Sequence, residues 1–172
     1  MALTDSLSGK VKGEIDIDLV RTGEGGHTGV DKLNKKLSLI LTDGSSSDQG
    51  TGFFSESFSM TTGGITISLG EATTPIAGAD CNPTEDPDGK DLRAILIHNE
   101  DDTNYVTVGL GTNALTGWLG GTTPTVRINA GGFLLQTFPS DQCTLDATGD
   151  ADEIKITADT AACICTVAYI FG

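Results

Sequence analysis

The stretch DLRAILIHNEDDTNYVTVGLG, residues 91–111, decides the fold class. Two short runs, LRAILIH and YVTVGL, lie on either side of an acidic segment that contains Glu100, Asp101 and Asp102. Short runs rich in β-branched and aromatic residues, with polar turn residues between them, are typical of strands rather than helices. We therefore predict two short strands that face each other across an acidic turn.

The same pattern continues in both directions along the chain. KVKGEIDIDLV at 10–20 and GFFSESFSMT at 52–61 alternate with period two, which is typical of strands with one wet face. Gly63 and Gly64 join the second of these to ITISLG at 65–70, and such a pair favours a β-hairpin. About ten or eleven short strands, with no sustained helical period, predict an all-β fold. We expect an antiparallel β-sandwich or jelly roll with an N-terminal strand or arm region.

The order of these segments suggests a division of the chain. Residues 1–70 form an N-terminal β region or arm, and residues 92–172 form the body, with which 1–70 is able to make one domain. Residues 71–91 form a long acidic loop that contains prolines, and loops of this length are usually functional or packed against a partner. The last run, at 162–172, is apolar at both parities, so we predict a central strand covered on each side.

The charge is strongly negative and unevenly distributed. The net charge of the 172 residues is −14; residues 1–50 carry six basic and eight acidic side chains, and the rest carries four and sixteen. An acidic body repels phosphate, which argues against nucleic acid and anionic membranes as direct partners. We expect the first third, which is near charge balance, to dock against an acidic surface, through candidate contact residues Lys10, Lys12, Lys35 and Lys36.

Neither a secretion signal nor an apolar run long enough to span a bilayer is recognisable in the sequence. We therefore expect a chain that is made in a cytosol and stays soluble there. The four cysteines are then expected to be reduced core residues, or to form a disulfide that involves Cys143, Cys163, Cys165 or Cys81. Cys163 and Cys165 lie two apart on one strand, at the limit of disulfide geometry, and should not pair with each other.

Acidic residues are numerous, but few have the spacing of a metal site. The best calcium candidates are Asp146, Asp150 and Asp152, and they are weak ones. We interpret the acidic tip at 99–104 and the glycine-rich loop at 23–29 as turns, because no capped helix follows the glycines to hold a phosphate. No arrangement of nucleophile and base is recognisable. We predict no enzymatic activity and no cofactor.

The only tryptophan, Trp118, lies in a loop rich in glycine and threonine, and Tyr105 is nearby in the sequence. Such aromatic residues stack on sugar rings in carbohydrate-binding sandwiches. They also anchor contacts between subunits, because large aromatic side chains contribute much of the binding energy of interfaces. Trp118 and Tyr105 are therefore candidate contact residues, either for a sugar or for another subunit.

The second half of the chain, residues 91–172, resembles small virion proteins of tailed bacteriophages. The resemblance lies in ILIHNEDDTNYVTVGLG, in VRINAGGFLLQTF and in DEIKITADTAACICTVAYIFG, which are strand and turn motifs. It implies a sandwich or jelly roll that decorates or cements a capsid, or that builds a tail, collar or fibre attachment. The chain differs from that pattern by its four cysteines and its separate N-terminal strand region.

The resemblance also implies partners and a location. The expected partners are copies of the chain itself, as a trimer or another symmetric homo-oligomer, and the major capsid protein or other virion proteins. The expected location is the virion, after assembly in the host cytoplasm. The acidic surface is consistent with a coat protein, which must stay soluble at high copy number. The other hypothesis is a carbohydrate-binding β-sandwich module.

Overall fold

The computed structural model describes residues 9–22, 28–43, 49–71, 85–115, 118–119, 124–138, 143–146 and 151–172. Up to residue 43 it describes strands and their pairing but no side chains. Within the described residues the chain is all-β and contains no helix, so none is present that could span a membrane. The strands of the described residues are β1 (Gly9–Thr22), β2 (Thr28–Asp43), β3 (Gln49–Gly50), β4 (Gly52–Met60), β5 (Ile65–Ser68), β6 (Leu92–Asn99), β7 (Val106–Leu110), β8 (Thr125–Ile128), β9 (Phe133–Thr137), β10 (Glu153–Ala158) and β11 (Cys163–Phe171).

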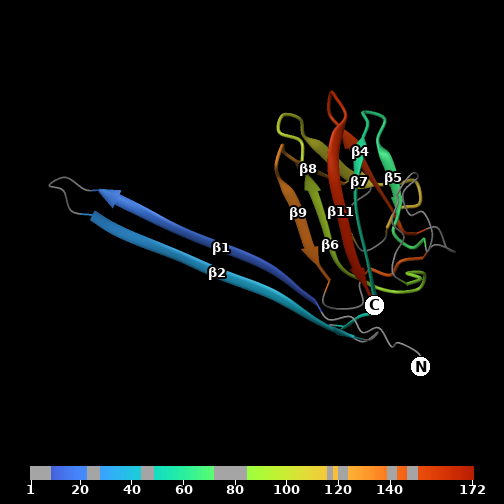
Figure 1. The fold of residues 1–172 in the computed structure, drawn as a ribbon, viewed down its shortest axis with the longest axis horizontal. Coiled ribbons are helices and arrows are strands. Elements are labelled where there is room, and N and C mark those ends of the chain that lie inside the picture. Colours follow the sequence, from blue (N-terminus) through green and yellow to red (C-terminus); the bar gives the residue numbers. More distant parts are fainter. Residues whose placement is uncertain are drawn as a thin grey trace.

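Eight of these strands form two antiparallel sheets of four strands each, in the orders β4-β11-β6-β9 and β5-β10-β7-β8 (Figure 1). The pairing is nested: β7 pairs with β8, β6 with β9, β5 with β10, and β4 with β11. The eight strands therefore pair like one long hairpin that has been folded into two sheets. Its bend is the segment between β7 and β8.

The two predicted hairpins are wrong, although the predicted strands and turns are present. β4 and β5 lie in different sheets, and so do β6 and β7. Each tight turn carries the chain from one sheet to the other, and the turns after β8 and β10 do the same. A tight turn reverses the chain whether the two strands then pair with each other or with distant strands. The local sequence signal is the same in both cases.

Gly64 shows how tight one of these turns is. Its N–H donates to the carbonyl oxygen of Thr61 at 3.0 Å, and its φ of +79° lies in the region that favours glycine. A Cβ atom at this position would lie 2.6 Å from the hydroxyl oxygen of Thr157 on β10. Glycine is therefore needed both for the backbone conformation and for the close approach of the next sheet.

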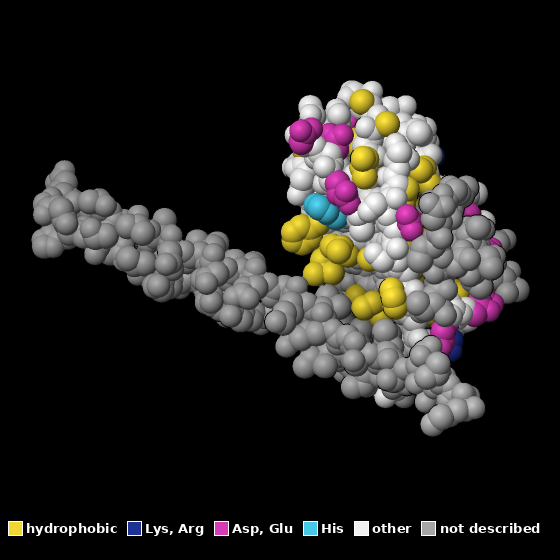
Figure 2. Space-filling model, in the orientation of Figure 1, with side chains coloured by type: hydrophobic (Ala, Val, Ile, Leu, Met, Phe, Trp, Pro, Cys, Tyr) yellow, Lys and Arg dark blue, Asp and Glu magenta, His cyan; other side chains and the backbone are white. Residues whose placement is uncertain are grey.

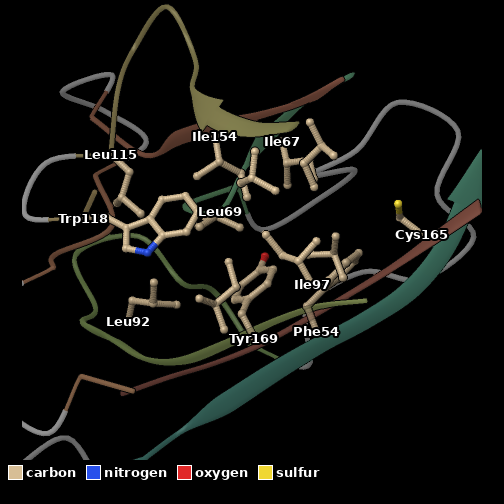
Figure 3. Close-up of a cluster of buried hydrophobic side chains, with 14 of the residues drawn as sticks. Phe54, Ile67, Leu69, Leu92, Ile97, Leu115, Trp118, Ile154, Cys165 and Tyr169 are labelled. Atoms are coloured by element: carbon tan, nitrogen blue, oxygen red, sulfur yellow. The ribbon is translucent and has the colours of Figure 1, made fainter. Parts of the chain in front are cut away.

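The two sheets share one hydrophobic core, to which inward-facing residues of both contribute (Figure 3). Tyr169 and Phe54 stack with ring centroids 5.2 Å apart, and Ile67 and Ile154 come from the other sheet. Strands β4 and β5 pair in these sheets with β11 and β10, which come after residue 92. The division at residues 70 and 91 remains a prediction.

The N-terminal hairpin of β1 and β2 extends away from the two sheets (Figure 1). The strands pair in register from Gly9 opposite Leu41 to Thr22 opposite Thr28. Among the described strands, β2 pairs otherwise only with the two-residue β3, at Thr42 and Asp43. This hairpin, residues 9–43, is called the arm below.

Candidate functional site

The outer face of the β4-β11-β6-β9 sheet carries mainly apolar side chains; we call it the apolar face. Alternation along the strands points the core residues inward and leaves the intervening residues outward. Phe133 is 66% exposed, Ile164 53% and Phe53 44%, which is unusual for side chains of this size. The outward residues of the four strands are Phe53, Ser55, Ser57, Ser59, Ala94, Leu96, His98, Phe133, Leu135, Thr137, Ile164, Thr166, Ala168 and Ile170.

Cross-strand register brings the largest of these residues together. Leu96 lies opposite Ala168 on one side and Leu135 on the other, and the adjacent row places His98 opposite Phe133. Small residues such as Ala168 leave a hollow of about 680 Å³ between the larger ones. Figure 2 shows hydrophobic side chains gathered on this side of the molecule beside a histidine. The result is a continuous apolar surface rather than scattered exposed residues.

One end of the apolar face is polar. The hydroxyl of Thr166 donates to the Glu100 carboxylate, and the Ser57 hydroxyl lies 3.2 Å from the same oxygen. The hydrogen bond from Thr166 is the main reason that the pKa of Glu100 lies below its usual value, and Ser57 and nearby His98 lower it further. Glu100 is therefore charged at neutral pH and marks one edge of the surface.

The outer face of the other sheet differs in character. The exposed or partly exposed side chains of its strands are polar: Thr66, Thr107, Thr125, Lys155 and Thr157. A hollow of about 400 Å³ lies on this face and has a more polar lining. Only one of the two outer faces thus has the composition of a buried surface.

The predicted acidic turn at 99–104 is an internally bonded turn. Asp101 Oδ1 accepts hydrogen bonds from the backbone N–H groups of Thr103 at 2.8 Å and Asn104 at 2.6 Å. These two bonds, that of Asn104 first, hold the pKa of Asp101 below its usual value. Asn99 is fully buried beneath the turn. The carboxylate of Asp101 is therefore occupied by its own turn, in keeping with the interpretation of this segment as structural.

Trp118 lies in the core and not on a contact surface. Its side chain lies among those of the core (Figure 3) and is 2% exposed. Its indole N–H donates to Gln136 Oε1 at 2.7 Å. The prediction that it stacks on a sugar or anchors a subunit therefore does not fit this structure. Tyr105 is partly exposed: the Arg127 guanidinium lies 3.6 Å above its ring, and a hydrogen bond to Asp159 raises its pKa.

The described cysteines are buried thiols. Cys163 and Cys165 both point inward on β11, and Cys143 is also fully buried. None of the three is bonded to another of them, and Cys81 lies outside the described residues. Burial raises the pKa of Cys143 and of Cys165 to about 12, so neither is a reactive thiolate at neutral pH.

The calcium candidates do not come together within the described residues. Asp152 is 3% exposed and its carboxylate accepts the backbone N–H of Gly70 at 2.8 Å, which fixes the end of β5. Burial is the main cause of its raised pKa. Asp150 lies outside the described residues, and the described part of the chain holds no cluster of His, Cys, Asp or Glu suited to a metal, including around Asp146.

Of the predicted contact lysines, the structure describes only their places in the arm. Lys10 and Lys12 on β1 pair with Ile40 and Ser38, while Lys36 pairs with Glu14. Lys35 is opposite Ile15 and so belongs to the other parity.

Sequence reasoning missed the apolar face itself. The last strand, β11, does lie between β4 and β6, as its composition predicts. Its outward side is only partly covered, however: Ile164 is 53% exposed, and Thr166, Ala168 and Ile170 are partly exposed. The sequence does show apolar residues at both parities of β11, but this pattern is the same for a strand buried in the chain's own core and for one that contacts another chain.

Comparison with known proteins identifies no relative: no family model, curated protein or solved structure matches this chain.

Proposed function

We propose that this chain is a non-enzymatic structural protein of a tailed-phage virion that decorates or cements the capsid through symmetric contacts between its own copies. The apolar face is the observation that carries this proposal. Its large side chains are exposed: Phe133 is 66% exposed and Phe53 44%. A continuous apolar surface of this kind usually marks a protein–protein contact.

The strand order supports the proposal by suggesting the finer architecture. Eight strands that pair in nested order and alternate between two sheets have the winding of a jelly roll. We infer a jelly-roll sandwich, a fold used by viral capsid proteins and by lectins. The fold alone does not choose between these functions, because one architecture hosts many. The burial of Trp118 removes the aromatic residue on which a sugar-binding reading rested.

The arm supports an assembly role. It carries six basic and six acidic residues between positions 9 and 43, whereas residues 44–172 carry four basic and seventeen acidic ones. A neutral arm on an acidic body is able to reach a neighbour without the repulsion that two acidic bodies experience. In this proposal the even-numbered positions with Lys10, Lys12 and Lys36 are turned to the capsid shell.

The experiment that tests the function is particle incorporation. The chain is expressed together with the virion genes encoded beside it, and purified particles are analysed by quantitative mass spectrometry. We expect the chain in a fixed ratio to the major capsid protein. A variant from which residues 9–43 have been deleted should be absent from the particles while its circular dichroism spectrum still shows a β-sheet body. Particles that contain no chain, although soluble chain is present, would refute the proposal.

A further inference from the structure

The arm has an apolar side of its own. The register places Val11 opposite Leu39, and Ile17 opposite Leu33, so the odd-numbered positions of the two strands share one side. The even-numbered positions include charged pairs such as Glu14 opposite Lys36. On the odd side between 9–17 and 33–41, Lys35 is the single charged residue; the aliphatic residues there are Val11, Ile15, Ile17, Leu33, Leu37, Leu39 and Leu41.

A two-stranded hairpin is marginally stable in water unless a further surface covers its apolar side. Beyond β3, no described strand pairs with the arm, which projects from the body (Figure 1). A strand of 14 residues, such as β1, spans roughly 48 Å at about 3.4 Å per residue. The arm is therefore long enough to reach a neighbouring copy.

The apolar face has the size and the low charge of a docking surface. Four strands about 4.8 Å apart give the face an area on the order of 500 Å², a large part of the roughly 800 Å² per partner in a standard interface. None of its outward residues is Asp, Glu, Lys or Arg, and Glu100 lies at its edge. Within 9–17 and 33–41, Lys35 is the complementary charge on the odd side of the arm; outside these segments the odd side also carries Arg21, Asp31 and Asp43.

We propose that the apolar face is the docking surface for the odd-numbered side of the arm of a second copy of this chain. The proposal deepens the proposed function and rests on its self-association, since it names the two surfaces that meet. The contact is heterologous, because one copy gives its arm and the next gives its face. Such contacts form closed rings when the rotation between copies allows closure.

Single charges placed on either surface test the proposal. Phe133→Asp and Phe53→Asp alter the apolar face at two exposed positions that line its hollow, and Thr125→Asp on the outer face of the other sheet is the matched control. Leu39→Asp alters the odd side of the arm, and Ser38→Asp, one residue away at the other parity, is its control. Mass is measured by size-exclusion chromatography with light scattering, and folding by circular dichroism.

We expect the wild type and both controls to be oligomers, with a mass of at least two copies of the 17.7 kDa chain, and the face and arm variants to be folded monomers. A monomeric wild type overturns the proposal. The proposal is also overturned if Leu39→Asp keeps the wild-type mass. It is overturned as well if both face variants are folded and keep that mass.

Mixing the variants separates this contact from other forms of self-association. Phe133→Asp retains an intact arm, and Leu39→Asp retains an intact apolar face. Docking of arm on face predicts that an equimolar mixture forms a complex of two copies and no larger one. A mixture that stays monomeric overturns the proposal. Contact of face with face would instead leave Leu39→Asp alone with the wild-type mass, and contact of arm with arm would leave Phe133→Asp alone with that mass.

These masses are measured without particles, so they are independent of the proposed function. Arm-on-face association of a chain that never enters particles would leave this inference standing and refute the virion role. Particles that incorporate the monomeric variants as well as wild type would support the virion role and overturn docking as its basis.

Discussion

The side-chain nitrogen of Asn99 lies 2.9 Å from the carbonyl oxygen of Asn104, across the turn that carries the chain from β6 to β7 in the other sheet. The same nitrogen lies 3.3 Å from the carbonyl oxygen of Ile128 and 3.2 Å from that of Asn129, at the end of β8. Its side-chain oxygen accepts the N–H of Asp101 at 3.2 Å. One buried amide therefore holds together two of the turns that cross between the sheets.

We predict that Asn99→Ala lowers the free energy of unfolding by about 2–4 kcal/mol, because it leaves buried backbone groups without their hydrogen-bond partner. Urea denaturation measures the change. Asn129→Ala is the matched control. Among the described residues its exposed side chain accepts one hydrogen bond, from Arg127 Nε–H at 2.9 Å, and its loss should cost less than about 1 kcal/mol. Equal losses in the two variants would contradict a special role for Asn99.

The sequence predicted the class of the fold and the position of most turns, but not which strands pair. Gly63 and Gly64 identify a reversal of the chain, and a reversal is present there. The pairing of β4 with β11 depends on residues about a hundred positions apart, which no local pattern encodes. The turn residues therefore predict where the chain reverses, but they do not show that each reversal leads into the other sheet.

The apolar face was unpredictable for a different reason. Ile164 and Ile170 are among the outward-facing residues of β11. Apolar side chains at alternate positions suit a buried core and a contact with another chain equally well. Trp118 shows the converse, because a loop of glycine and threonine suggested exposure while the indole packs inside. Burial depends on what covers a residue, and hydropathy alone does not report that.

Gly64→Ala should lower the free energy of unfolding by about 2–4 kcal/mol, since alanine adds strain at positive φ and crowds the adjacent strand. A Cβ atom there would lie 2.6 Å from Thr157 Oγ1 and 3.2 Å from the carbonyl oxygen of Ile156. Gly131→Ala is the control: its φ is +66°, but a Cβ atom would meet nothing within 4 Å, so only about 1 kcal/mol of strain is expected. Chemical denaturation of both variants measures the difference, and equal losses would exclude crowding as a cause.

Tyr169→Phe should raise the free energy of unfolding by about 1 kcal/mol. The Tyr169 hydroxyl is buried and has no hydrogen-bond partner among the described residues, so removing it relieves a desolvation cost. Tyr105→Phe should have the opposite sign, because that hydroxyl is hydrogen-bonded to Asp159. Thermal melts followed by circular dichroism compare the two, and a lower melting temperature for Tyr169→Phe would mean that its hydroxyl is satisfied.

Two buried thiols link stability to alkaline pH. Burial raises the pKa of Cys165, and of Cys143, to about 12 in the folded chain, against about 8.5 for a thiol in an unfolded chain. Above pH 8.5 the unfolded chain therefore releases protons that the folded chain retains. This contribution to stability is fully present below pH 8.5 and is lost as the pH rises toward 12.

We predict that the free energy of unfolding falls between pH 8.5 and pH 10 by up to about 2 kcal/mol for each of these thiols. The double variant Cys143→Ala/Cys165→Ala should be less stable at pH 7, because it leaves small cavities, and should have a flatter alkaline profile. Guanidinium denaturation at closely spaced pH values, under a reducing agent to prevent oxidation, measures both curves. Parallel curves for wild type and double variant would contradict the prediction, since the loss would then come from groups other than these two thiols.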